Sequence, residues 1–221
     1  MTGILIVIDG GDAAGKKTQT ALLVERLKKE GNTVHTLDFP QYESFFGKLV
    51  ARYLRGEFGS LDEVKPELVS LLYALDRFDQ ADVIKGWVAE GAIVVLDRYV
   101  ESNLAYQSAK LKGDIAAFVS WIQELEHGKL GIPKADLVCY LHVPVDVSEK
   151  LMADRPDKSY LGGEKSDIHE ADRNFQRRVV ETYLALSKRM GWKVVECAPD
   201  GALLSKEEIA GRLFAAIKDS I

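Results

Sequence analysis

The sequence predicts an α/β fold, a doubly wound five-stranded parallel sheet flanked by helices. Three observations lead to this prediction. Apolar runs alternate with helical patterns along the whole chain, which indicates β-α-β units with right-handed crossovers. The runs are almost continuously apolar, as is typical of parallel strands covered on both faces. A glycine-rich loop follows the first run and opens a helical pattern.

Each expected element has its own signal. Short runs rich in β-branched residues are the expected strands, at residues 4–8, 33–38, 92–96, 137–143 and 193–196. Helical periodicity places helices at residues 18–30, 47–55, 66–90, 102–110, 115–127, 147–153, 168–190 and 206–218. Three helix starts carry a capping-box pattern, namely Asp146 with Glu149, Asp167 with Glu170, and Ser205 with Glu208. Within 66–90, Leu72, Leu75 and Val83 are expected in the core.

Length and composition predict a single domain over residues 1–221, with ordinary hydrophobic (47%) and charged (29%) fractions. The net charge of −5 argues against general nucleic-acid binding. No apolar run is long enough to span a bilayer, and the chain enters a strand too early to leave room for a signal peptide. Cys139 and Cys197 lack metal-site spacing, so free thiols in the cytoplasm are expected. The polar segment 155–166, with two adjacent glycines, is predicted to be a mobile lid.

The loop after the first strand is predicted to bind phosphate groups. Its glycines allow backbone N–H groups to turn toward an anion, Lys16 adds a positive charge, and the following helix presents its N-terminus. The usual pattern G-x-x-x-x-G-K-[ST] continues with a hydroxyl that ligates Mg²⁺, but here that position is Lys17. The candidate phosphate-binding residues are Gly10, Asp12, Ala13, Ala14, Gly15, Lys16, Lys17, Thr18 and Arg155.

Acidic and basic residues gather where the strands end. Asp9, Asp38 and Asp97 end three expected strands, at the edge where ligands bind in this fold class. Asp97 is the candidate Mg²⁺ ligand, directly or through water, and Arg98 is placed to clamp a second phosphate. One cation of the lid is expected to approach the transferred group. The candidate catalytic residues are therefore Lys16, Asp97, Arg98, Arg155 and Lys165.

Two further segments have the side chains that could recognise a base and a sugar. Tyr73 and Arg77 are four residues apart on one helix, so an aromatic ring and a guanidinium share one face. The segment 102–107 interleaves a hydroxyl, amides and an aromatic ring on a short helix, with Ser102, Tyr106 and Gln107 as the candidates. In isolation, either segment could instead be simple helix packing.

These motifs, in this order, resemble the thymidylate kinase family of nucleoside monophosphate kinases. The resemblance covers most of the chain, and its most discriminating part is the stretch DRYVESNLAYQ at 97–107. It implies a P-loop kinase with strand order 2-3-1-4-5 that transfers phosphate from ATP to dTMP, uses Mg²⁺ and forms a homodimer through helices. It also implies that the following residues contact dTMP: Asp12, Phe39, Pro40, Tyr42, Tyr73, Arg77, Arg98, Ser102, Tyr106 and Gln107.

The resemblance also implies separate roles for these residues. Tyr73 stacks on thymine while Arg77 contacts the base edge, and Arg98 binds the acceptor phosphate. Ser102 and Gln107 help read the base, and Tyr106 crowds the 2′ position of the sugar, which favours deoxyribose. Arg155 faces ATP from the lid, because Ala13 occupies the loop position where many members carry a catalytic arginine.

The chain departs from the family pattern in two places. Lys17 replaces the loop hydroxyl, and Gln41-Tyr42 stands where an arginine often binds the acceptor phosphate. A tyrosine can hydrogen-bond a phosphate but cannot neutralise it. Two alternatives therefore remain at this point. One is a deoxynucleoside kinase with Asp38 as the base for a 5′-hydroxyl, and the other is a nucleotide-binding module with little turnover.

Overall fold

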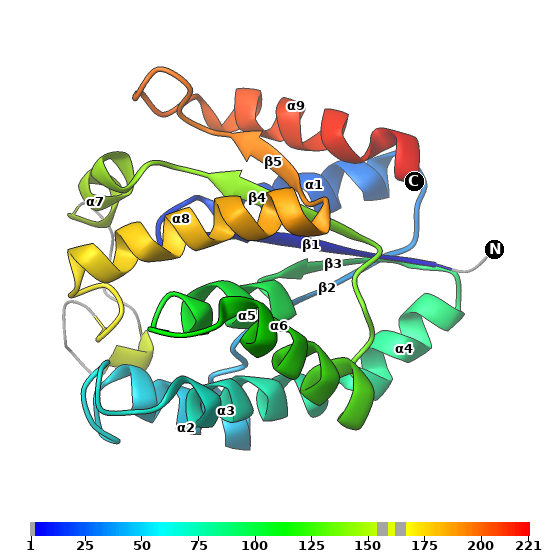
Figure 1. Cartoon of the computed structure of the whole chain (residues 1–221). Coiled ribbons are helices and arrows are strands. Elements are labelled where there is room, and N and C mark those ends of the chain that lie inside the picture. The colour runs from blue at the N-terminus through cyan, green and yellow to red at the C-terminus, as the bar shows by residue number, and fades with distance from the viewer. Residues whose placement is uncertain (1–2, 154–158, 162–166) are drawn as a thin grey trace.

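The computed structural model describes residues 3–153, 159–161 and 167–221, and its described strands form one parallel sheet (Figure 1). The strands are β1 (Ile4–Gly10), β2 (Val34–Asp38), β3 (Ile93–Asp97), β4 (Leu137–His142) and β5 (Lys193–Glu196). Their order across the sheet is β2-β3-β1-β4-β5, and every neighbouring pair is parallel. The predicted fold class and the strand order that the resemblance implied are therefore confirmed.

The sheet separates two hydrophobic cores, because successive side chains of a strand point to opposite faces. Leu5 and Val7 of β1 enter one core, together with side chains of α5 (Val100–Ser108), α6 (Ile115–Gln123) and α8 (Arg173–Met190). Ile6 and Ile8 enter the other core, which α1 (Lys16–Lys29) and α9 (Lys206–Ile217) cover. The inner strands β1, β3 and β4 are buried on both faces, which explains why their runs in the sequence are almost continuously apolar, whereas the edge strands β2 and β5 are partly exposed.

Of the remaining helices, α2 (Phe45–Leu54) and α3 (Pro66–Phe78) lie together beyond the edge of the sheet at β2. The helix α4 (Ala81–Ala89) packs against β3, and α7 (Val145–Ala153) packs against α8. A third, smaller apolar cluster holds α2 against α3 through Val50, Tyr53, Leu54 and Val69. This pair of helices forms a wall opposite the sheet, and the space between wall and sheet becomes the site described below.

Two predicted helices are interrupted. The helix expected over 66–90 is two helices, because the chain turns at Asp79–Gln80 so that Ala81 and Ile84 can enter the core beneath β3. Val83, expected in the core, is exposed (44%), and Leu72 and Leu75 are only partly buried. The helix expected over 115–127 is α-helical only as far as Gln123, and a π-helical turn, Glu124–Lys129, follows it.

Of the three predicted capping boxes, only the pair of Ser205 and Glu208 forms one. Asp146 lies inside the first turn of α7, where its carboxylate pairs with Arg173 at 2.7 Å. Asp167 accepts hydrogen bonds from the N–H groups of His169 and Glu170 in a turn, but the long helix begins later, after the cap Asp172. Side chains that cap a turn therefore resemble helix starts in the sequence.

Candidate active site

The glycine-rich loop connects β1 to α1 and is closed by its own lysine. The Lys16 ammonium donates to the carbonyl oxygens of Gly10 (3.2 Å) and Gly11 (2.6 Å). Gly15, with φ 79°, and Ala13, with φ 58°, adopt the left-handed backbone that folds the loop over the start of the helix. Ala14 is buried beneath it. The loop therefore has the backbone shape of an anion cradle, with Lys16 lying across it.

Lys16 is buried (8% exposed), and burial lowers the pKa of its ammonium to about 8. Arg98 lowers this pKa further, whereas the nearby carboxylates, with Asp97 the strongest, raise it. Lys17 and Thr18 lie on the exposed first turn of α1, and Lys17 lines a separate groove with Asp38 and Asp97. Because one helical step turns a side chain by about 100°, Thr18 does not take the position of the missing hydroxyl.

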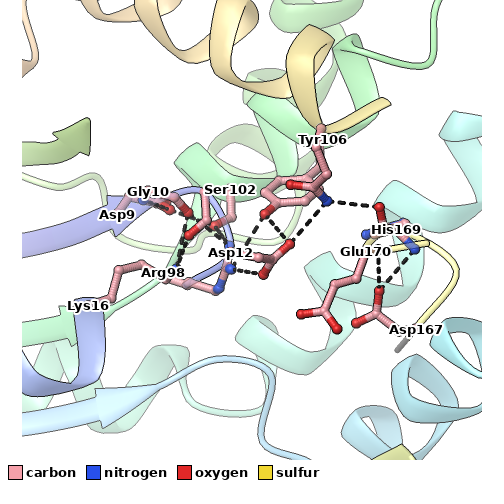
Figure 2. A network of polar contacts seen from close by, with 12 residues as sticks. Asp9, Gly10, Asp12, Lys16, Arg98, Ser102, Tyr106, Asp167, His169 and Glu170 are labelled. Atoms are coloured by element: carbon pink, nitrogen blue, oxygen red, sulfur yellow. Dashed lines mark hydrogen bonds and ion pairs between the residues drawn. The ribbon is translucent and has the colours of Figure 1, made fainter. Parts of the chain in front are cut away.

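Arg98 joins the loop to the helix α5 (Figure 2). Its guanidinium donates to Gly10 O (3.3 Å), Ser102 Oγ (3.1 Å) and Asp12 Oδ1 (2.7 Å). The Tyr106 hydroxyl donates to the other oxygen of Asp12 at 2.9 Å. Ser102 in turn donates to Asp9 Oδ1 at 2.7 Å, where the Tyr183 hydroxyl also donates. These bonds connect residues of β1, the loop, α5 and α8 in one network.

A cavity opens on the far side of this network, between the sheet and the α2–α3 wall. Every residue that the resemblance placed against dTMP lines it: Asp12, Phe39, Pro40, Tyr42, Tyr73, Arg77, Arg98, Ser102, Tyr106 and Gln107. Further residues that were not expected at the site from the sequence also line the cavity, namely Leu54, Tyr99, Asn103, Tyr160, Asp167 and His169. Of these, Tyr99 and Asn103 stand inside the stretch 97–107 and Tyr160 inside the predicted lid, whereas Asp167 was expected only to cap a helix. Leu54 and His169 carry no local signal.

Several polar groups of the cavity wall have no hydrogen-bond partner among the residues that the structure describes. Both amide atoms of Gln107 are buried without a hydrogen bond, and so is Asn103 Oδ1. Buried polar groups are normally paired, because an unpaired one costs about 1–3 kcal/mol. A ligand with its own donors and acceptors would satisfy them. The wall therefore suits a molecule with hydrogen-bonding groups of its own rather than a purely apolar one.

Aromatic side chains close the cavity on its outer side. Tyr42 stacks on Tyr160 with ring centroids 4.1 Å apart. His169 stacks on Tyr106 at 5.4 Å, and burial lowers its pKa to about 3, so it is neutral at physiological pH. The Tyr53 hydroxyl lies 3.0 Å from His169 Nε2. Tyr42 thus faces the cavity as a neutral hydroxyl, at the place where a cation was lacking in the sequence.

The strand ends offer oxygen ligands for a divalent cation beside the loop. Asp38 and Asp97 are register partners on β2 and β3, and both line the groove at Lys17. Burial raises the pKa of the Asp97 carboxyl, while Lys16 and Arg98 act to lower it. Within residues 3–153, 159–161 and 167–221, no three His, Cys, Asp or Glu side chains gather into a metal site. Mg²⁺ commonly takes one or two carboxylates and completes its shell with phosphates and water, so these residues fit it.

Two candidate catalytic residues, Arg155 and Lys165, and most of the predicted lid 155–166 lie outside the described residues. The described turn Ser159–Leu161 places Tyr160 at the cavity. No helix of the described chain is long and apolar enough to cross a membrane.

The pKa of Lys16 leads to a prediction about anion binding. Only the ammonium form attracts phosphate, so affinity for inorganic triphosphate should fall about tenfold between about pH 7 and about pH 9, as free Lys16 loses its proton near its lowered pKa. Calorimetry of the wild type and Lys16→Arg across this range would measure it, since arginine keeps its charge. An equal fall in the arginine variant would assign the effect to another group.

Comparison with known proteins agrees with this geometry. A family model described as thymidylate kinase matches residues 8–209. A thymidylate kinase of Mycobacterium tuberculosis is 34% identical over 191 residues (86% of this chain, 87% of the relative), and the human thymidylate kinase is 31% identical over 198 residues (89% and 83%). A probable thymidylate kinase of Thermococcus onnurineus is 34% identical over 223 residues (99% and 98%).

Among solved structures, a thymidylate kinase from Candida albicans has the same fold, with a TM-score of 0.75 over 99% of this chain and 92% of that one, at 21% identity. The matched range contains the loop, the Arg98 network and all the predicted dTMP residues. The chain belongs to the thymidylate kinase family.

Proposed function

We propose that this protein transfers the terminal phosphoryl group of ATP to dTMP, which yields dTDP and ADP. One observation carries the proposal. The Arg98 guanidinium bonds both to the loop that would hold ATP, at Gly10 O and Asp12, and to Ser102, which lines the cavity with Asp12. Two anionic substrates bound in these two places would therefore meet end to end at a shared cation.

On the donor side, backbone N–H groups of the loop would hold the ATP phosphates. Lys16 would leave the carbonyl oxygens of Gly10 and Gly11 and bind the terminal phosphates, which would offset the loss of solvation that burial imposes on it. Gly10, Asp12, Ala13, Ala14, Gly15, Lys17 and Thr18 complete the proposed donor site. Arg155 and Lys165 remain the proposed cations of the lid, with Arg155 on the ATP side.

On the acceptor side, Tyr73 would stack on thymine, and Arg77 and Gln107 would contact its polar edge. Ser102 would assist them, while Tyr106, held by Asp12, would crowd the 2′ position of the sugar. Arg98 would bind the 5′-phosphate, with Tyr42 as a neutral hydrogen-bond donor beside it. Phe39 and Pro40 would form the apolar side of the cavity.

The reaction needs positioning and charge neutralisation more than a general base. A monophosphate has a second pKa near 6, so its oxygen is already a nucleophile at neutral pH. Arg98 and Lys16 would hold the two substrates so that this oxygen faces the terminal phosphorus of ATP. We place Asp97 as the carboxylate that holds Mg²⁺, directly or through water, with Asp38 beside it. Bound there, Mg²⁺ would neutralise the charge on the phosphate oxygens.

A coupled assay that follows ADP release tests the function and both alternatives. The proposed kinase releases ADP with ATP and dTMP and is inactive with thymidine. Release with thymidine but not dTMP would indicate a deoxynucleoside kinase that uses Asp38 as the base. Nucleotide binding with no ADP release from either compound would indicate a binding module, which Lys17 and Tyr42 would then explain.

Arg98→Ala should lower kcat/KM for dTMP at least about 100-fold, because a positioned cation at the transferred phosphate is lost. Arg189→Ala is the matched control, since Arg189 is exposed in the last turn of α8, away from the network. Steady-state kinetics and thermal melting of both variants separate catalysis from folding. Unchanged kcat/KM in a folded Arg98→Ala protein would remove Arg98 from the acceptor site.

Lys17→Thr tests whether Lys17 replaces the function of the loop hydroxyl that ligates Mg²⁺ in the usual pattern. If Lys17 supplies charge near the phosphates, restoring the hydroxyl should strengthen the apparent Mg²⁺ affinity, measured with bound ADP by calorimetry, and lower turnover. Lys28→Thr, on the same flank of α1 but further from the loop, is the control. A variant with unchanged metal affinity and unchanged activity would contradict this account.

We also propose that the protein forms a homodimer through helices. On α3, Leu68 (57%), Leu71 (37%) and Phe78 (47%) form an exposed apolar stripe at helical spacing. Sedimentation equilibrium should give about twice the chain mass of 24.5 kDa. Leu68→Glu with Leu71→Glu should give monomers, whereas Leu203→Glu, on another exposed surface, should not. A dimer that persists in the double variant would place the interface elsewhere.

The cytoplasm is the proposed compartment. Cys139 and Cys197 are buried free thiols, and burial raises the pKa of each thiol to about 12. Free cysteines that form no disulfide are expected of a protein kept in a reducing compartment.

A further inference from the structure

Arg77 is held by a carboxylate that the sequence analysis did not single out. Glu126 accepts from Arg77 Nε and Nη2, each at 2.6 Å, and the side chains are 2% and 0% exposed. Burial works to lower the pKa of Arg77, but Glu126 outweighs it and raises that pKa above its usual value. A buried ion pair costs desolvation energy and is often no more stabilising than an apolar pair, so stability alone does not account for it.

Glu126 also fixes the orientation of a second side chain. Asn103 Nδ2 donates to Glu126 Oε1 at 2.8 Å and to the carbonyl oxygen of Ser70 at 3.2 Å. Both partners are acceptors, so the NH₂ group of the Asn103 amide must face them and its oxygen must face the other way. That oxygen, Oδ1, is buried and unpaired. Arg77 Nη1 likewise makes no hydrogen bond within the described residues.

The two side chains line the cavity, and Glu126 lies behind them. Glu126 reaches this place from the π-helical turn Glu124–Lys129, where Leu130 N donates to Leu125 O, five residues back. Turns of this type are rare and occur often at functional sites. One carboxylate thus orients two residues of the cavity wall that keep groups of opposite character: Asn103 keeps a hydrogen-bond acceptor, and Arg77 keeps a donor.

We propose that Glu126 is a positioning residue that sets the choice of base. The inference rests on the proposed function. Thymine offers an N3–H donor beside the O4 acceptor, which complements an amide oxygen and a guanidinium N–H. Cytosine offers the opposite pattern, an N3 acceptor beside an N4–H₂ donor, and would leave groups in this wall unpaired. Uracil has the same hydrogen-bonding edge as thymine. Glu126 would therefore favour thymine and uracil over cytosine but would not distinguish thymine from uracil.

Glu126→Gln tests this role. A glutamine amide can donate as well as accept, so the Asn103 amide is free to turn over and present its NH₂ group to the cavity. The preference for dTMP over dCMP, as a ratio of kcat/KM, should fall at least about tenfold, while the ratio of dTMP to dUMP stays within about twofold. Glu124→Gln, in the same turn but 63% exposed, is the matched control and should change neither ratio.

Removing one partner of a buried ion pair can destabilise a protein by about 3–5 kcal/mol, so Glu126→Gln could fail to fold. Glu126→Asp, which keeps the negative charge, is therefore a second test of the same role. Aspartate keeps the charge but is too short to hold Arg77 and Asn103 together, so the variant should melt cooperatively and still lose selectivity. A folded variant with wild-type selectivity, or one that weakens all three nucleotides equally, would overturn the proposal. An aspartate variant that does not fold would make Glu126 purely structural and would also overturn it.

Dissociation constants for dTMP, dUMP and dCMP, measured by calorimetry without ATP, separate this inference from the proposed function. If the wild type binds dTMP but does not phosphorylate it, the function fails, and the ratios of dissociation constants still test Glu126. If the wild type phosphorylates dTMP and the Glu126 variants keep its base preference in both measurements, the inference alone fails.

Discussion

The contact between Arg98 and Asp12 is the interaction on which the rest of the site depends. Arg98 Nη2 and Asp12 Oδ1 are 2.7 Å apart, and the two side chains are only 19% and 11% exposed. Asp12 belongs to the phosphate loop, whereas Arg98 follows the third strand, so the pair ties two elements that are distant in the sequence. Tyr106 and Ser102 bond to the same two residues, and Asp9 bonds to Ser102. A change in any of these side chains would alter the position of the others.

Parallel strands bring these residues together. Because β1 and β3 are neighbours in register, with Ile8 opposite Asp97, the loop after one strand and the arginine after the other start from the same edge. The Arg98 N–H donates to Ile8 O at 3.0 Å, which extends this pairing by one residue. The helices α2 and α3 then close the space beyond the edge. In the proposed function, the edge of the sheet supplies the groups that bind anions, and the helices supply the surface that recognises a ring.

Much of this arrangement could be predicted from the sequence. The apolar runs located the described strands, with ends shifted by two residues or fewer. The pattern is strongest in β1, β3 and β4, because these strands are buried on both faces. The cavity residues that contact dTMP in the proposed function were predicted from motifs that follow one another in the same order as in the thymidylate kinase family. Helix ends were less predictable, since Asp167 caps a turn with the same side-chain bonds that begin a helix. The prediction that Val83 lies in the core was wrong, because helical spacing identifies an apolar stripe but does not show which element, if any, covers it.

Glu126 was missed for a different physical reason. The sequence places it among charged residues that face solvent, such as Glu124, and a change from α to π winding has no clear signature. One signal was present: Glu126 follows the fully buried Ile122 by four residues, so a carboxylate stands on the buried face of that helix. Partners from α3 and α5, which neutralise and orient it, cannot be identified before the tertiary structure is known.

The backbone of Arg98 has a consequence for how the site balances stability and chemistry. Its φ of 65° is a conformation that glycine adopts freely and that costs other residues about 1–2 kcal/mol. Glycine would relieve this strain but would leave no cation at the junction. The sharp bend directs the guanidinium back over the loop instead of outward along the strand. The protein therefore tolerates a local conformational penalty, and a positive charge is fixed in place before either substrate arrives.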